Sequence, residues 1–91
     1  MRRNAKVDVN QGDIVDALRA VGAKVEPLHQ VGGGVPDLLV SWRGDLWLLE
    51  VKVPGGKLTP KQQEWHAVWR CDRVRIVTSV DQALRAIGAI T

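Results

Sequence analysis

The stretch VGGGVPDLLVSWRGDLWLLEVK, residues 31–52, holds three consecutive glycines followed by two apolar segments that meet at Arg43-Gly44. Short apolar segments that include β-branched or aromatic residues are typical of β-strands, and a glycine between two such segments is typical of a tight turn. The stretch therefore predicts a β-hairpin with strands at 36–41 and 46–53. The glycine run predicts a loop before the hairpin, since glycine adopts positive φ without strain.

The predicted hairpin brings three charged residues together. Turns of two or of four residues both set Asp37 directly opposite Glu50, and alternation puts Lys52 on the same face. Two carboxylates facing each other across a ladder repel, so a compensating cation is expected, and a divalent metal would supply it. A simpler interpretation is that Lys52 only pairs with one of the carboxylates near solvent. Because Pro36 holds Asp37 at the mouth of the glycine loop, we favour a site for a hard cation and a phosphodiester.

Helix caps and periodicity predict the other elements. Thr59-Pro60-Lys61-Gln62 and Ser79-Val80-Asp81-Gln82 are capping boxes that each open a helix. Asn10 is expected to cap the start of the first helix and Gly22 to end it. The predicted helices cover 10–21, 59–70 and 79–88, and the further strands cover 24–28 and 74–78. The fold class is therefore α/β, in the order α-β-β-β-α-β-α.

The composition limits the class of protein. A chain of 91 residues with 45% hydrophobic content supports one compact core and hence one domain. Since no window is apolar enough to span a bilayer and Met1 to Asn4 precede no apolar run, we expect a soluble intracellular protein. Cys71 is the single cysteine, so an internal disulfide cannot form. The net charge of +3 makes a polyanion such as nucleic acid a candidate partner.

Three motifs occur in order on the expected elements. They are Gly33-Gly34-Val35-Pro36-Asp37, Leu49-Glu50-Val51-Lys52 and Lys57-Leu58-Thr59-Pro60-Lys61-Gln62. With these motifs the chain resembles the PD-(D/E)XK nuclease superfamily, and more narrowly the small stand-alone VRR-NUC (virus-type replication-repair nuclease) domains of phage and bacteria. The resemblance implies a restriction-endonuclease-like core, with a mixed central sheet flanked by helices. Residues 10–91 would form this nuclease domain and residues 1–9 a basic N-terminal arm.

The resemblance also implies a metal site. Asp37 and Glu50 would be ligands of Mg²⁺ or Mn²⁺, and Lys52 would position the attacking water. Many similar domains carry a glutamate in the first helix, where this chain has Gln11, three residues before Ile14. Three interpretations stay open: Gln11 contacts a metal through a water, the site uses one metal with fewer protein oxygens, or the activity is reduced.

A glutamine early in the helix after Lys52 would complete the site. We favour Gln62, because Trp65 and Trp69 follow it at three and seven residues on the stripe expected to pack against the sheet. Gln63 is turned away by about 100° and is the rival.

The expected function is that of a hydrolase, a Mg²⁺- or Mn²⁺-dependent endodeoxyribonuclease similar to Holliday-junction resolvases. A flap or single-strand nuclease and a non-catalytic nucleic-acid-binding module with the nuclease fold are the alternatives. The expected location is the cytoplasm of a bacterium or of a phage-infected host. Contacts to DNA phosphates are expected from Lys57, Arg70, Arg73 and His29.

The resemblance further implies a homodimer that acts on branched DNA, a four-way junction or a flap. The surfaces expected to be shared are the apolar segment 83–90 and Trp42, which is expected to be exposed at the turn. Burial of segment 83–90 within one subunit is the alternative.

Overall fold

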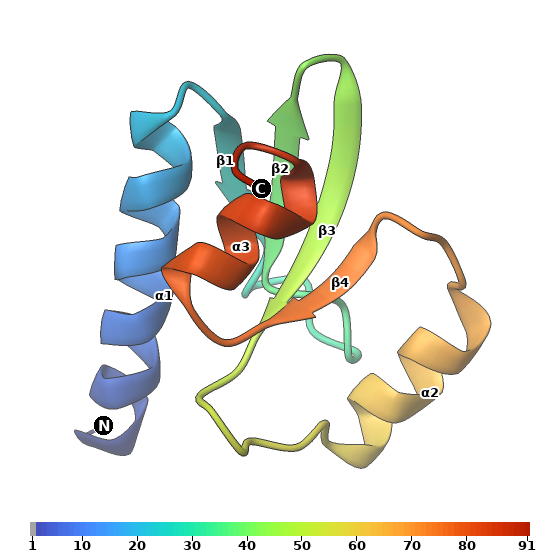
Figure 1. Ribbon diagram of the computed structural model, residues 1–91. Helices are drawn as coiled ribbons and strands as arrows, with labels where there is room; N and C mark the ends of the chain where they lie inside the picture. The colour runs from blue at the N-terminus through green and yellow to red at the C-terminus, as the bar shows by residue number, and fades with distance from the viewer. Residues whose placement is uncertain (1) are drawn as a thin grey trace.

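A computed structural model describes the backbone of residues 2–91 and the side chains of residues 10–91. The elements are α1 (Arg2–Ala20), β1 (Lys24–Pro27), β2 (Leu38–Trp42), β3 (Asp45–Val51), α2 (Pro60–Val68), β4 (Val74–Val77) and α3 (Val80–Ile87), as Figure 1 shows. Their order confirms the predicted α-β-β-β-α-β-α arrangement.

The four strands form one mixed sheet in the order β1-β2-β3-β4. The pairs β1–β2 and β2–β3 are antiparallel, and β3–β4 is parallel. Leu38 pairs with Leu49 and Trp42 with Asp45, so the register predicted for the hairpin is confirmed and its turn has two residues. These turn residues, Arg43-Gly44, have φ of 50° and 87°, the combination that a type I′ turn requires.

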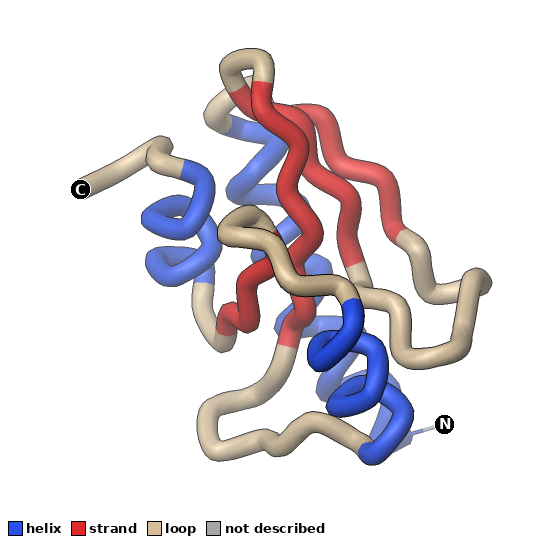
Figure 2. The backbone as a smooth tube through the Cα atoms, turned by 90° about the vertical axis from the view of Figure 1, so that its right-hand side faces the viewer, coloured by secondary structure: helices blue, strands red, loops and turns tan. Residues whose placement is uncertain are grey.

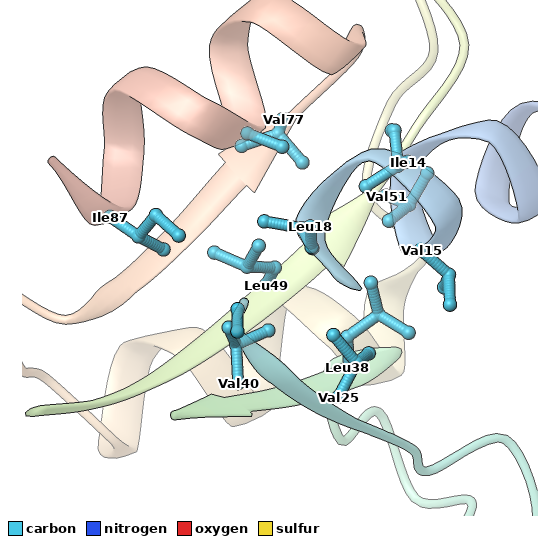
Figure 3. Packing of buried hydrophobic residues seen from close by; sticks show 12 residues of the cluster. Ile14, Val15, Leu18, Val25, Leu38, Val40, Leu49, Val51, Val77 and Ile87 are labelled. Atoms are coloured by element: carbon cyan, nitrogen blue, oxygen red, sulfur yellow. The ribbon is translucent and has the colours of Figure 1, made fainter. Parts of the chain in front are cut away.

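Helices α1 and α3 cover one face of the sheet and enclose the core (Figure 3). The helical side chains of this core recur at the spacing of one helix face, and the strand side chains alternate. Its members include Ile14, Leu18 and Ile87 from the helices and Leu38, Val40, Leu49 and Val51 from the sheet. The core therefore lies on the sheet face opposite the one predicted for Asp37 and Glu50.

The last helix uses its apolar side within the subunit. Ala83 and Ile87 are buried, and Gly88 with φ of 85° ends the helix as a left-handed cap. Burial within one subunit, the alternative given for segment 83–90, thus holds for Ala83 and Ile87, whereas Ile90 is 37% exposed. Trp42 is also half-buried against the core, so the expectation of an exposed tryptophan at the turn is wrong.

Helix α2 lies on the other side of the sheet, in front of it in Figure 2, and is only loosely packed. It has no buried residue, and Val68 and Trp69 are 76% and 60% exposed. Trp65 is half-buried, so the predicted sheet-packing stripe is formed at Trp65 and not at Trp69. A helix of nine residues without a buried side chain can cover only part of the sheet.

The first helix begins at Arg2, well before the predicted start at Asn10. Residues 2–9 contain neither glycine nor proline, so nothing in them ends a helix, and asparagine is tolerated inside one. The side chains of the predicted basic arm lie outside the described residues. Within residues 2–91, none of the helices has the length and apolar character needed to cross a membrane.

Candidate active site

Asp37 is fixed between two neighbouring segments. Its carbonyl oxygen accepts a hydrogen bond of 2.7 Å from the backbone N–H of Leu28, which extends the β1–β2 pairing by one residue. Its carboxylate oxygen Oδ2 accepts a hydrogen bond of 2.7 Å from the backbone N–H of Val51. The buried Pro36 precedes it. The carboxylate is therefore held at the end of β3 by both the loop and the strand.

Glu50 is the second-last residue of β3 and is only 1% exposed. Its Oε2 accepts a hydrogen bond of 3.2 Å from Nε2 of Gln62 and lies 3.9 Å from Nζ of Lys52. Its Oε1 is buried and has no hydrogen-bond partner among the described residues. A buried carboxylate oxygen without a partner is costly, and this one is therefore the natural place for a bound cation.

Gln62 joins these groups through the first turn of α2. Thr59 caps the helix by accepting a hydrogen bond of 3.2 Å from the Gln62 N–H. The Gln62 Oε1 accepts from the Thr59 N–H at 2.8 Å and from Nζ of Lys52 at 2.7 Å. Gln63 instead donates to the carbonyl of Leu58 and is exposed. Of the two candidate glutamines, only Gln62 reaches Glu50 and Lys52.

An apolar groove of about 440 Å³ lies on the same sheet face as Glu50. Leu39 and Leu48 line it from the sheet, and Trp65 and Trp69 line it from α2. The two indole rings stack with centroids 5.5 Å apart and planes 12° from parallel. The face thus carries a polar site at one end of β3 and an open apolar surface next to it.

The geometry and the fold agree with one family. A family model for the VRR-NUC domain matches residues 3–80. The chain belongs to the VRR-NUC family. A solved structure titled "VRR_NUC domain" is similar, with 31% identity, a TM-score of 0.75, and coverage of 94% of this chain and 98% of that one. No match is found among the curated proteins. The chain is therefore a nuclease-fold domain of the PD-(D/E)XK superfamily with a DNA-processing function.

The first helix of this VRR-NUC domain touches the site through a residue that the sequence did not point to. Asn10 donates a hydrogen bond of 3.3 Å from Nδ2 to the carbonyl of Lys52. The spacing in the sequence could have indicated this contact, because Asn10 lies four residues before the buried Ile14 and therefore on the same face of α1. Gln11, the next residue, is half-buried on the same helix.

The residues predicted to contact DNA lie in two places. His29 and Lys57 are exposed in the loops that flank the end of β3 (Figure 1), whereas Arg70 and Arg73 follow α2. Arg73 forms an ion pair of 3.2 Å with Asp45, and its guanidinium lies over the ring of a tryptophan of β3. The fold thus does not bring Arg73 to the site of Glu50.

The donor set of this VRR-NUC domain fits a hard divalent cation. Asp37 and the unpartnered Oε1 of Glu50 offer carboxylate oxygens, which Mg²⁺ and Mn²⁺ prefer. Among the side chains of residues 10–91, no group of three or more His, Cys, Asp or Glu residues is arranged to hold a metal. Magnesium sites with one or two protein carboxylates, completed by water and phosphate oxygens, are common.

The charges of the site shift two pKa values. Burial raises the pKa of Glu50 from 4.5 to about 8, the neighbouring Asp37 carboxyl adds to this rise, and the Lys52 ammonium opposes it. Burial, helped by the same ammonium, lowers the pKa of His66, one turn beyond Gln62 on α2. Without a cation, Glu50 therefore binds a proton at neutral pH.

The raised pKa of Glu50 predicts a pH-dependent stability in the presence of a chelator. Between about pH 4.5 and about pH 8 the folded protein holds a proton that the unfolded chain has released, so the free energy of unfolding falls as the pH rises. Glu50→Gln should remove this fall and stabilise the protein at the upper end by on the order of a few kcal/mol. Urea denaturation near both pH values measures the free energy of unfolding.

The comparison of variants isolates Glu50, since any contribution from His66 is common to both proteins. Glu64→Gln, at an exposed position of α2, is the matched control and should leave the pH dependence unchanged. Equal slopes in the wild type and in Glu50→Gln would contradict the assigned environment of Glu50.

Proposed function

We propose that the domain is a Mg²⁺- or Mn²⁺-dependent endodeoxyribonuclease. The observation that carries this proposal is the unpartnered, buried Oε1 of Glu50 next to the Asp37 carboxylate. When bound by these two residues, the cation would supply positive charge for polarising a phosphodiester and activating water. Orientation of the attacking water and of the charged groups would be carried out by Lys52 and Gln62.

Lys52 is the residue that would orient the attacking water and neutralise charge on the phosphate. Its side chain is 16% exposed, so its ammonium is shielded from solvent but can still reach a bound substrate. The hydrogen bond to Gln62 restricts where Nζ can lie. An ammonium fixed in advance stabilises developing negative charge without reorganisation at the moment of reaction.

Gln62 orients the two charged groups with its one amide. Its oxygen accepts from Lys52 and its nitrogen donates to Oε2 of Glu50. The donation to Oε2 leaves Oε1 of Glu50 for the cation. Gln62 therefore acts as a positioning residue, and its loss should affect turnover more than DNA binding.

DNA would lie across the loops that flank the site, with Lys57 and His29 contacting phosphates, whereas Arg70 borders the apolar groove at the other end of α2. These contacts carry no base specificity, because phosphates are the same along the strand. Gln11 in place of the family glutamate favours the rival function, a non-catalytic DNA-binding module. We retain the nuclease because Asp37, Glu50, Lys52 and Gln62 are all present.

Substitutions in the site should separate an enzyme from a binding module. Asp37→Asn and Lys52→Ala should each lower kcat by at least ~100-fold, because charge stabilisation and water orientation are lost. Gln62→Ala should lower it by roughly 10-fold or more, and Gln63→Ala is the matched control that should not. Nicking of labelled four-way junctions, flaps and linear duplex with Mg²⁺, Mn²⁺ or chelator measures these effects.

DNA affinity, measured in parallel, should be nearly unchanged in Lys52→Ala. Wild-type turnover in Asp37→Asn would refute the site. A wild type that binds DNA but cuts none of the substrates with either metal would favour the binding module.

We further propose that two copies pair through the apolar groove, giving a homodimer that suits a symmetric four-way junction; a flap or single strand is the alternative substrate. Leu46 is 60% exposed at the edge of the groove, close to the exposed side chains at the end of α2. The nearby charges have both signs, with Arg70 and Asp72 exposed and Arg73 paired with Asp45. A mixed rim is self-complementary across a two-fold axis, whereas a strand of DNA requires a positive one.

A charge in the groove should separate the protomers. Leu46→Glu should convert the dimer to a monomer in light scattering at micromolar concentration, because the buried charge would lack a partner. Ile90→Glu places the same charge at another exposed apolar residue and is the control. The monomer should still nick a junction but lose paired, symmetric cuts. A monomeric wild type would contradict the dimer and leave the nuclease proposal intact.

A further inference from the structure

The glycine loop touches the first turn of α2 at one position, Gly34. A Cβ atom added there would overlap the carbonyl oxygen of Lys61 and lie 2.7 Å from its carbonyl carbon and 3.0 Å from the backbone nitrogen of Gln62. All three are backbone atoms of a helix, which cannot rotate away as a side chain would. The contact therefore requires glycine, independently of the positive φ of 85° at this position.

The two preceding glycines differ from Gly34 in this respect. Gly32 and Gly33 also have positive φ, 75° and 67°, but a Cβ atom at either would meet nothing within 4 Å. A methyl group at Gly33 would thus introduce a similar backbone strain without touching α2. Gly33→Ala therefore tests the left-handed backbone alone, and Gly34→Ala tests the left-handed backbone together with the close approach to α2.

No fully buried side chain fixes the position of α2. The helix has no buried residue, and the side chains at its far end are mostly exposed. Its first turn, by contrast, is touched by the loop backbone at Lys61 and at Gln62, whose side chain bonds to Lys52 and Glu50. The same loop ends at Asp37, whose carboxylate is fixed to β3.

We propose that Gly34 is a positioning residue for the reaction, acting through Gln62. Close approach of the loop backbone to α2 sets the place of the first helical turn, so that the Gln62 amide bridges Glu50 and Lys52. One loop then places both Asp37 and, through this contact, Gln62. The inference rests on the proposed function for its effect on turnover, but its geometric part can be tested without DNA or metal.

The geometric test is the NMR signal of the Gln62 side-chain amide in metal-free protein. Gly34→Ala should shift this signal strongly, toward the position of an amide that has lost its hydrogen bond to Glu50, while Gly33→Ala should leave it near its wild-type position. An unchanged amide in Gly34→Ala, or equal shifts in both variants, would overturn the proposal. A wild type that failed to cleave DNA would refute the nuclease function and leave this result valid.

The kinetic test is a double-mutant cycle between Gly34→Ala and Gln62→Ala. Gly34→Ala should lower kcat by roughly 10-fold or more with little change in KM, and should add almost nothing in the Gln62→Ala background. If the kcat loss of the double variant equalled the product of the two single losses, Gly34 would act independently of Gln62 and the proposal would be overturned. If Gly34→Ala fails to fold, Gln62→Ala alone decides, because wild-type kcat in that variant would show that nothing acts through this amide.

Discussion

The burial of Glu50 next to the carboxyl group of Asp37 governs the organisation of this domain. Glu50 is buried on a strand, and Asp37 is held beside it by a hydrogen bond to the next backbone amide of that strand. Burial and the Asp37 carboxyl together raise the pKa of Glu50 to about 8. Strongly shifted pKa values cluster at functional sites, and here the hairpin, the glycine loop and α2 converge on the shifted carboxyl group.

The fold separates stability from chemistry by the two faces of one sheet. On one face α1 and α3 enclose the apolar core, and on the other the site lies under the first turn of a loosely held helix. This division explains how Gln62 can be well placed on a helix that buries nothing. The capping box at Thr59 and the backbone contact at Gly34 fix the first turn alone, while the rest of α2 borders an open groove.

Local rules in the sequence were sufficient to place the central residues of the candidate site. The turn at Arg43-Gly44 fixed the register, and alternation then placed Asp37, Glu50 and Lys52 on one face. The capping box and its spacing to Trp65 indicated Gln62. These predictions depended on contacts between residues close in sequence or paired across one hairpin.

Long-range contacts were not predictable in the same way. Asn10 was predicted to cap the first helix, but it lies inside a longer helix. Its side chain bonds to the backbone carbonyl of Lys52, 42 residues away. The exposure of Trp69 depends on how far α2 extends over the sheet, and helical periodicity does not contain that information. The need for glycine at position 34, as opposed to 33, likewise follows from the distance to another element.

The central claim, that this carboxylate pair is built for a divalent cation, is tested most directly by calorimetric titration of Mn²⁺ into the DNA-free protein. We predict one class of site in the wild type, lost in Asp37→Asn and in Glu50→Gln and retained in Gln63→Ala. Binding should also release protons below about pH 8, since Glu50 must ionise to bind the metal. Undiminished Mn²⁺ binding in both carboxylate variants, or no binding in the wild type, would contradict the account.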